Sequence, residues 1–248
     1  MSAAVKLQDD ARPAVGLLIR AFDEAIAWHL SRLVMTDDEV AQLMANARNQ
    51  AFWVGNVAQL RLVQDVFDEI AKGMQQGLGY AEFSRAMAGK LARAWGGANP
   101  SRVEVMWRTA IQTAYNAGRW RQMEQPAVKR FRPFRMYDAV LDSRTTPYCR
   151  DRDGIVKPAD DNWWDTNWPP LHYNCRSGVR SLTPRQAMRK GIAPSDLKIP
   201  DAQGSFGNSP RAAGFANWRP EPKGYDTTTY SALIAKAEKA GPDATGTI

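Results

Sequence analysis

Two runs of sequence decide the fold: Asp142-Ser143-Arg144-Thr145-Thr146-Pro147-Tyr148-Cys149-Arg150-Asp151-Arg152-Asp153-Gly154 and, further along, Pro169-Pro170-Leu171-His172-Tyr173-Asn174-Cys175-Arg176. Together they hold both cysteines of the chain and one of its two histidines. Zinc in proteins is commonly bound by thiolate and imidazole, and the short spacing of His172 and Cys175 is typical of one half of a zinc site. We therefore expect Cys149, His172 and Cys175 to lie together in the fold and to form a candidate metal site.

The sequence leaves the fourth ligand of such a site open. Structural zinc sites are almost always tetrahedral, so three residues need one more partner. Asp142, Asp151 and Asp153 are candidates, and a water molecule in this position would leave an open, catalytic type of site. Two other interpretations stay open as well: buried free thiols beside a hydrogen-bonded histidine, or a cysteine nucleophile activated by His172.

Extended segments are expected around these residues. After Pro126 the pattern changes from helical to extended, and the aromatic and branched residues over 131–141 predict a first strand. Asp153-Gly154 predicts a turn into a short strand over 155–157, and residues 177–182 predict a further strand. The first cysteine would then lie in the connection between two strands. Three tryptophans in the following polar loop are expected to pin it to the body of the protein: Trp163, Trp164 and Trp168.

The first hundred residues are predicted to be helical. Apolar residues recur at helical spacing from Val15 to Leu33, from Leu60 to Met74 and from Phe83 to Trp95. Gly77 is expected to end the second of these helices. His29 lies beside the first stripe without a ligand-type neighbour in sequence, so we expect it at the boundary of the apolar face and not on a metal.

Two capping patterns predict where helices begin. Thr36 followed by Glu39 is one capping box, and Ser101 followed by Glu104 is a second one that opens a helix running to about Met123. Small residues on one side of this long helix should allow another element to approach closely: Ala110, Ala114 and Gly118.

The end of the chain differs in composition. Thr183-Pro184 has the cap and first-turn proline of a helix, but residues 194–224 contain many prolines and glycines and predict an extended arm. A short terminal helix is predicted over 225–240. We therefore expect three parts: an N-terminal helical region (1–100), a core (101–190), and an extended arm with a short terminal helix (191–248).

The totals narrow the class of protein. The 248 residues are 44% hydrophobic, which is enough for a sizeable core. No apolar run approaches the roughly 20 residues that cross a bilayer, and the first residues lack the apolar core of a signal peptide. We expect a soluble protein made in a reducing cytoplasm, where two cysteines are poor evidence for a disulfide.

Basic residues are concentrated in the middle of the chain. The net charge is +7, and residues 102–135 contain eight basic but only two acidic side chains. Such a surplus favours a polyanion or an acidic protein surface, although a solvated helix face would have the same composition. The candidate contacts with nucleic acid or a partner are Arg119, Arg121, Lys129, Arg130, Arg132 and Arg135.

Two patches of the chain resemble the Mu F-like head-morphogenesis proteins of tailed phages. One is Arg108-Thr109 with Tyr115-Asn116-Ala117-Gly118-Arg119; the other runs from Asp142 through Cys149 and Asp153-Gly154 to Pro169-Pro170-Leu171-His172 and Asn174-Cys175-Arg176. Members of this family often have a Cys-x-x-Cys before the His-x-x-Cys, which looks like a complete zinc tetrad. In this chain Thr146 stands in place of the first of those cysteines, so only three of the four ligands remain.

The resemblance implies a minor capsid protein in the virion, made in the host cytoplasm and associated with the portal vertex inside the procapsid. Its implied partners are the portal protein and the major capsid or scaffold proteins, with packaged double-stranded DNA as a secondary partner and no membrane. It would assist head assembly and genome packaging or delivery.

The resemblance and the residue patterns together predict an α+β fold and a protein that is not an enzyme. The fold would have an N-terminal helical region, a small mixed or antiparallel sheet with a Cys/His loop, and an extended C-terminal arm. The alternatives are a metal-dependent enzyme, such as a nuclease-like effector, and a zinc-clipped DNA-binding module. Against the nuclease, the region after residue 190 is too short and too broken to hold a separate toxin domain.

Overall fold

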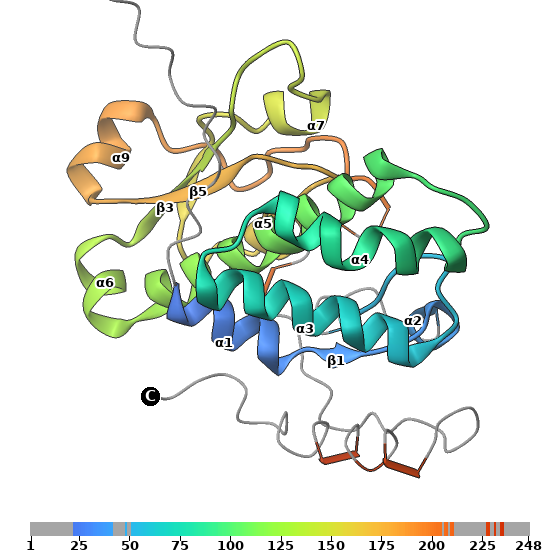
Figure 1. Cartoon of the computed structure of the whole chain (residues 1–248). Helices are drawn as coiled ribbons and strands as arrows, with labels where there is room; N and C mark the ends of the chain where they lie inside the picture. Colours follow the sequence, from blue (N-terminus) through green and yellow to red (C-terminus); the bar gives the residue numbers. More distant parts are fainter. Residues whose placement is uncertain are drawn as a thin grey trace, which may run out of the picture.

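A computed structural model describes residues 22–41, 48, 51–204, 206–207, 209–210, 227–228, 231 and 234–235. In this part of the chain, helices form one side of the molecule and a three-stranded sheet lies on the other, as Figure 1 shows. The long helix α5 (Pro100–Glu124) packs against helices on one side and against the sheet on the other. The α+β fold class is therefore confirmed.

The helical side is built by α1 (Asp23–Ser31), α3 (Leu60–Gln76), α4 (Tyr80–Ala94) and α5. Their apolar stripes enclose one core, as the helical spacing predicts. The helix α3 ends at Gly77, whose φ of 70° is the left-handed conformation that glycine adopts without strain. No described helix is long and apolar enough to serve as a membrane span.

The first predicted stripe is only partly correct. Val15, Leu18 and Ile19 lie outside the described residues, whereas Leu30 is exposed and Leu33 has left the helix. Leu33 belongs to β1 (Leu33–Val34), which pairs in parallel with β2 (Ala51–Phe52). So short a pair has no sequence period of its own and was not predicted.

The histidine on α1 is not at a boundary. The side chain of His29 is completely buried, stacks on Phe67, and has its Nε2 atom 3.0 Å from the carbonyl oxygen of that residue. It is therefore part of the helical core, and the expectation of a boundary position was wrong.

For one predicted capping box the glutamate half is confirmed, and the other capping box is corrected. The carboxylate of Glu39 accepts hydrogen bonds from the backbone N–H and the hydroxyl of Thr36 at the start of α2 (Asp37–Ala41). The helix α5, in contrast, begins two residues earlier than expected: Asn99 is its cap and Pro100 its first residue. Proline at the first position and asparagine before it are the stronger start signal.

Close packing along α5 is confirmed at Gly118. A Cβ atom at this position would lie 2.7 Å from the backbone nitrogen of Ala25, a residue of α1. Only a residue without a side chain lets the two helices approach so closely.

The segment after Pro126 is a correction as well, because it begins as a helix. The helix α6 (Pro126–Phe131) has proline at its first position and precedes β3 (Phe134–Asp138). The sheet has the order β4-β3-β5, with β4 (Val156–Pro158) and β5 (Gly178–Leu182) both antiparallel to β3. The sheet is thus fully antiparallel. Three short helices lie in the connections around the sheet: α7 (Pro147–Arg150), α8 (Trp164–Asn167) and α9 (Pro184–Lys190). Thr183 caps α9 as predicted.

The described beginning of the arm is extended chain that lies on the body of the protein. The backbone N–H groups of Ala193 and Gln203 donate to the carbonyl oxygens of Val156 and Leu171. The side chains of Ile199 and Ala202 pack on the apolar cluster beneath the sheet. Most of the predicted terminal helix over 225–240 lies outside the described residues.

Candidate metal site

The two thiols and the imidazole are brought together by the antiparallel sheet. Cys149 lies on α7, in the connection between β3 and β4, as predicted, while His172 and Cys175 precede β5. The sulfur of Cys149 is 3.2 Å from Nε2 of His172 and 3.6 Å from the sulfur of Cys175. One ligand atom from each of the three residues lies within 4.8 Å of the other two, which confirms the predicted cluster.

The ring of His172 is held in its orientation by contacts of both its nitrogen atoms. Nε2 of His172 faces the sulfur of Cys149, and its Nδ1 lies 2.7 Å from the carbonyl oxygen of Tyr173. Metal-ligating histidines usually donate their second ring N–H to such an acceptor, which sets the tautomer. The ring is therefore already held in an orientation that suits a ligand.

Hydrogen bonding polarises the two thiols in opposite directions. The thiol of Cys175, together with His172 and the hydroxyl of Tyr137 at 3.4 Å, lowers the pKa of Cys149. Its hydrogen bond to Cys149 and its burial raise the pKa of Cys175, and the hydrogen bond to Cys149 raises the pKa of His172. Of the two thiols, Cys149 is therefore the one whose surroundings favour the thiolate form.

The spacing of the ligand atoms suits zinc. At a zinc–sulfur distance of about 2.3 Å, tetrahedral geometry separates two sulfurs by about 3.8 Å. The 3.6 Å between the sulfurs of Cys149 and Cys175 is close to this value. In the described part of the chain, no carboxylate joins the group. Three protein ligands fit, and the fourth position would fall to a water molecule.

Thr146, which stands in the place of a family cysteine, begins the short helix that carries Cys149. Its hydroxyl oxygen is buried and has no hydrogen-bond partner among the described residues. A buried, unpartnered hydroxyl is costly. Position 146 therefore has a buried hydroxyl group in this chain, where the family often has a thiolate ligand.

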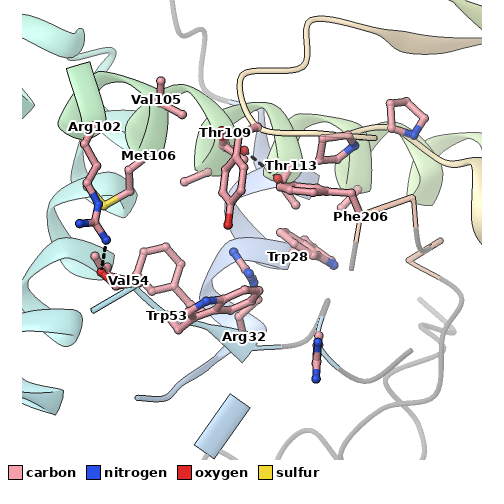
Figure 2. A pocket seen from close by; sticks show the side chains of 18 of the residues that line it. Trp28, Arg32, Trp53, Val54, Arg102, Val105, Met106, Thr109, Thr113 and Phe206 are labelled. Carbon is pink, nitrogen blue, oxygen red and sulfur yellow. Dashed lines mark hydrogen bonds between the residues drawn. The ribbon is translucent and has the colours of Figure 1, made fainter. Parts of the chain in front are cut away.

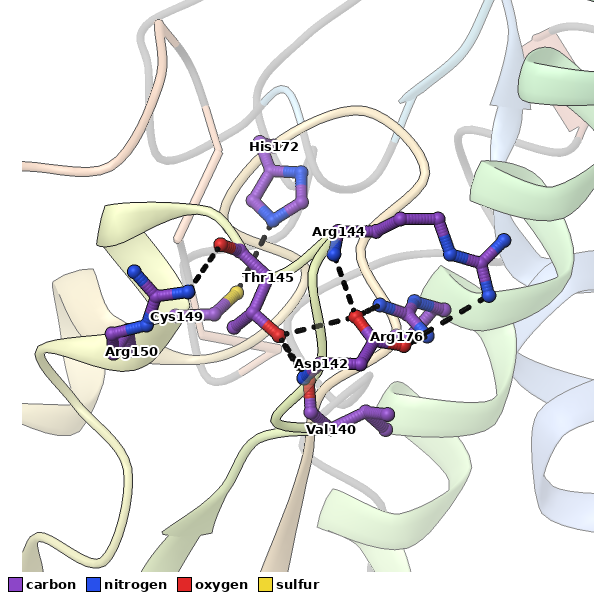
Figure 3. Close-up of polar contacts among 8 residues, drawn as sticks. All are labelled: Val140, Asp142, Arg144, Thr145, Cys149, Arg150, His172 and Arg176. Carbon is purple, nitrogen blue, oxygen red and sulfur yellow. Dashed lines mark hydrogen bonds and ion pairs between the residues drawn. The ribbon is translucent and has the colours of Figure 1, made fainter.

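Asp142 has another role than the predicted fourth ligand. Its two carboxylate oxygens accept hydrogen bonds from both terminal nitrogens of Arg176, at 2.6 and 2.7 Å, as Figure 3 shows. The backbone N–H of Arg144 donates to the same carboxylate at 2.9 Å. These contacts, led by Arg176, hold the pKa of Asp142 well below its usual range. The pair closes the loop around the cluster by joining its first residue to its last.

The other two candidate ligands are also placed away from the group. The carboxylate of Asp153 accepts a hydrogen bond from the backbone N–H of Ala139 at 2.9 Å and so fixes the turn between β3 and β4. Asp151 is exposed at the end of α7. Both belong to turn structure, which is the common use of aspartate beside glycine.

The tryptophans fill the space beneath the cluster. Trp164 and Trp168 are almost completely buried, and the three predicted tryptophans pack in one apolar group with Cys149 and Cys175. The ring of Trp168 meets that of Trp120 on α5 edge-on, with centroids 4.7 Å apart. The expectation that these side chains pin the loop to the body is therefore confirmed.

The six basic candidates are not equivalent. Arg119 and Arg130 are exposed, although one terminal nitrogen of Arg119 donates to the carbonyl oxygen of Val179 at 3.5 Å, and Arg121 is half-buried. The remaining three are engaged within the chain: Arg132 donates to the carbonyl oxygen of Ser181, Lys129 pairs with Glu124 and Asp160, and Arg135 pairs with Glu124 under the rings of Trp120 and Trp168. With 1% of its surface exposed, Arg135 does not reach a partner.

Sequence reasoning missed two buried cations that hold the arm. Arg152 is 1% exposed and donates to Asn167 and to the carbonyl oxygens of Tyr148 and Pro200. Lys157 is completely buried and donates to the carbonyl oxygen of Pro194 at 2.6 Å. Both residues lie close to the Asp153-Gly154 turn. Charged side chains are normally expected at the surface, so nothing in the sequence indicated that these two are buried.

The region that contains the site is similar to a known protein family. Residues 64–180 match the family described as Phage Mu protein F like protein, and this range holds most of α3, all of α4 and α5, the three ligand residues and the Asp142–Arg176 pair. This match covers 117 of the 248 residues, so the chain is similar to the Mu F-like family over just under half of its length.

Two relatives give the extent of the similarity. The chain is 28% identical over 203 residues to the "Putative capsid assembly protein F" of Escherichia phage Mu, which covers 75% of this chain and 42% of that protein. It is 26% identical over 176 residues to the Mu-like prophage FluMu F protein of Haemophilus influenzae (strain ATCC 51907 / DSM 11121 / KW20 / Rd), covering 66% of this chain and 41% of that protein. The chain therefore spans less than half the length of these relatives. No solved structure matches it.

Proposed function

We propose that this protein assists the assembly of a tailed-phage head as a minor, non-catalytic component at the portal vertex inside the procapsid. The observation that carries the proposal is the match of residues 64–180 to the Mu F-like family, together with a relative named for capsid assembly. On this proposal the protein contacts the portal and the major capsid or scaffold proteins, and it is found in the virion or, during assembly, in the host cytoplasm.

The composition of purified procapsids tests this proposal. Procapsids from cells that produce the encoding phage would be separated from free protein by sedimentation and analysed by quantitative mass spectrometry. We expect the chain at a few copies per procapsid, and its loss from procapsids made without the portal protein. A chain that stays entirely in the free fraction would refute the proposal.

The buried Cys/His cluster supports a structural role over a catalytic one. Cys149, His172 and Cys175 are each at most 9% exposed, so a macromolecular substrate has no access to the thiolate. We propose that the cluster binds zinc through these three side chains and clips the α7 connection to the segment before β5. Such a clip stabilises a loop-rich region that buries little apolar surface by itself.

Elemental mass spectrometry of the purified protein tests the clip. We expect close to one zinc per chain in the wild type, and its loss in both Cys149→Ser and His172→Ala. Asp153→Asn serves as the matched control, because Asp153 lies in the same loop but outside the group, and it should keep the metal. Wild-type protein purified without chelators and free of metal would contradict the clip and leave a hydrogen-bonded thiolate–imidazole pair in its place.

DNA is proposed as a secondary partner, through the exposed Arg119 and Arg130. Retention on double-stranded DNA at physiological ionic strength should fall steeply with added salt, because each phosphate contact releases counterions. Replacing both arginines with glutamine should reduce the salt dependence. Absence of retention at low salt would remove DNA from the proposed partners and leave the assembly role unchanged.

A further inference from the structure

A cavity of about 500 Å³ lies in the helical half of the molecule. One wall is α5, with Val105, Met106 and Thr109, and the facing wall contains Trp28 and Trp53, as Figure 2 shows. Its lining is mostly apolar and aromatic. None of the three ligand residues of the Cys/His cluster lines this cavity, so it is a separate feature of the fold.

A buried arginine lines this cavity. Arg32, between α1 and β1, is 6% exposed, and its guanidinium lies 4.8 Å from the ring centre of Trp28 and 5.3 Å from that of Phe52. One terminal nitrogen donates to the carbonyl oxygen of Ala51. Its Nε atom is buried without a hydrogen-bond partner among the described residues. A cation is thus held inside the protein with only part of its hydrogen-bonding capacity used.

The unsatisfied groups around the cavity share one chemistry. Besides Nε of Arg32, the buried atoms without a described partner are Nε1 of Trp28 and Nε of Arg48, and each is an N–H donor. None of the described residues that line the cavity is an aspartate or a glutamate. Burial lowers the pKa of Arg32 to about 9, which is the sign of a charge without local compensation. Among the residues that the structure describes, the cavity therefore has apolar walls and no anionic acceptor.

We propose that this cavity binds a segment of a partner head protein in which a large apolar side chain stands next to a carboxylate. The carboxylate pairs with the guanidinium of Arg32, and the apolar side chain lies between Trp53 and Met106. A planar guanidinium matches a carboxylate with two parallel hydrogen bonds. The inference depends on the proposed function only for the source of the segment, a protein of the phage head.

Size and burial favour a peptide over nucleic acid. A volume of about 500 Å³ is in the range of pockets that hold one small ligand or two to three side chains. The phosphates of a DNA duplex lie on a rigid rod and contact exposed cations, whereas Arg32 is buried behind aromatic rings. A peptide side chain can enter such a cavity and a duplex cannot.

Two short peptides that differ in one group test the proposal. Isothermal titration calorimetry would compare acetyl-Leu-Trp-Asp-Leu-amide with acetyl-Leu-Trp-Asn-Leu-amide on the purified full chain. We expect the Asp peptide to bind about tenfold more tightly, since only its carboxylate neutralises the buried cation. Equal affinities, or no binding of either peptide at millimolar concentration, would overturn the proposal.

Three variants tie the binding to this cavity. Arg32→Gln should reduce the difference between the two peptides to less than about twofold. Val105→Trp adds a large side chain to the α5 wall of the cavity and should weaken both peptides about tenfold or more, so the test stands even if Arg32→Gln does not fold. Arg185→Gln, at an exposed arginine of α9, should leave both affinities unchanged. Unchanged binding in Val105→Trp would show that the peptides bind elsewhere and would overturn the proposal.

The outcome is independent of head assembly, because it is measured on the isolated protein. If the chain binds the Asp peptide but never enters procapsids, the proposed function is refuted and the proposed peptide binding stands. If the chain enters procapsids but binds neither peptide, the proposed peptide binding is refuted and the proposed function stands.

Discussion

Buried cations are treated differently in the two halves of the molecule. In the sheet half, Arg152 and Lys157 donate to described carbonyl and amide oxygens, and Arg135 pairs with Glu124. In the helical half, Arg32 has one described carbonyl acceptor, two aromatic rings and a cavity beside it. Buried cations therefore bind backbone and side-chain oxygens in the sheet half, whereas Arg32 in the helical half uses only part of its hydrogen-bonding capacity.

This difference separates a structural role from a binding role. A buried charge that is fully hydrogen-bonded rigidifies the fold, whereas one that is partly satisfied costs stability unless a ligand completes it. The sheet half is accordingly held together by its polar side chains and its tryptophans, and the helical half by its continuous apolar core.

Truncating a tryptophan in each half should have the largest effect. Trp164→Ala removes a completely buried ring and a hydrogen bond to the carbonyl oxygen of Pro158, and should lower the free energy of unfolding by about 3–5 kcal/mol. Trp53→Ala, at a half-buried residue beside the cavity, should cost about 1–2 kcal/mol, because part of its surface already faces open space. Urea denaturation measures both values. Equal losses would show that the cavity wall is as tightly packed as the sheet half.

Replacing buried arginines with methionine tests the comparison itself. Arg152→Met leaves the oxygens of Asn167, Tyr148 and Pro200 without their donor and should cost about 2–3 kcal/mol in the free energy of unfolding. Arg32→Met should cost less than about 1 kcal/mol or stabilise, because an apolar side chain of similar length removes an uncompensated charge. Thermal and urea unfolding of both variants would decide. A larger loss in Arg32→Met than in Arg152→Met would contradict the distinction.

The same change at two glycines should have opposite signs. Gly118→Ala places a methyl group against the backbone of Ala25 and should destabilise by about 1–3 kcal/mol. Gly89→Ala, in the interior of α4 with the nearest atom 3.9 Å away, should stabilise by about 0.5–1 kcal/mol through helix propensity. Shifts in the midpoint of urea unfolding measure the two effects. A neutral Gly118→Ala would mean that α1 moves freely on α5.

Much of the sheet half could be predicted from the sequence. The turn at Asp153-Gly154, the strands on either side and the short His172–Cys175 spacing each have a local signal, and the topology then brings Cys149 to the other two ligand residues. The role of Asp142 could not be predicted, because its partner Arg176 lies 34 residues away and nothing local distinguishes a loop-closing pair from a ligand.

The missed features depend on tertiary structure. The two-residue strands β1 and β2 are too short for a period, and the six-residue helix α6 lies directly before the aromatic run that predicts a strand. The buried positions of Arg32, Arg152 and Lys157 contradict what charge predicts, and only the fold reveals which of them is satisfied. The cavity is a property of how α5 meets the β2 region, and no stretch of sequence encodes it alone.

Removal of the protein from an infection tests the central claim most directly. The gene for this chain would be interrupted in the phage that encodes it, and lysates would be examined by electron microscopy for complete, DNA-filled heads. The account predicts that such heads are lost and that the intact gene supplied in trans restores them. A normal yield of filled, infectious heads without the protein would contradict a role in head assembly.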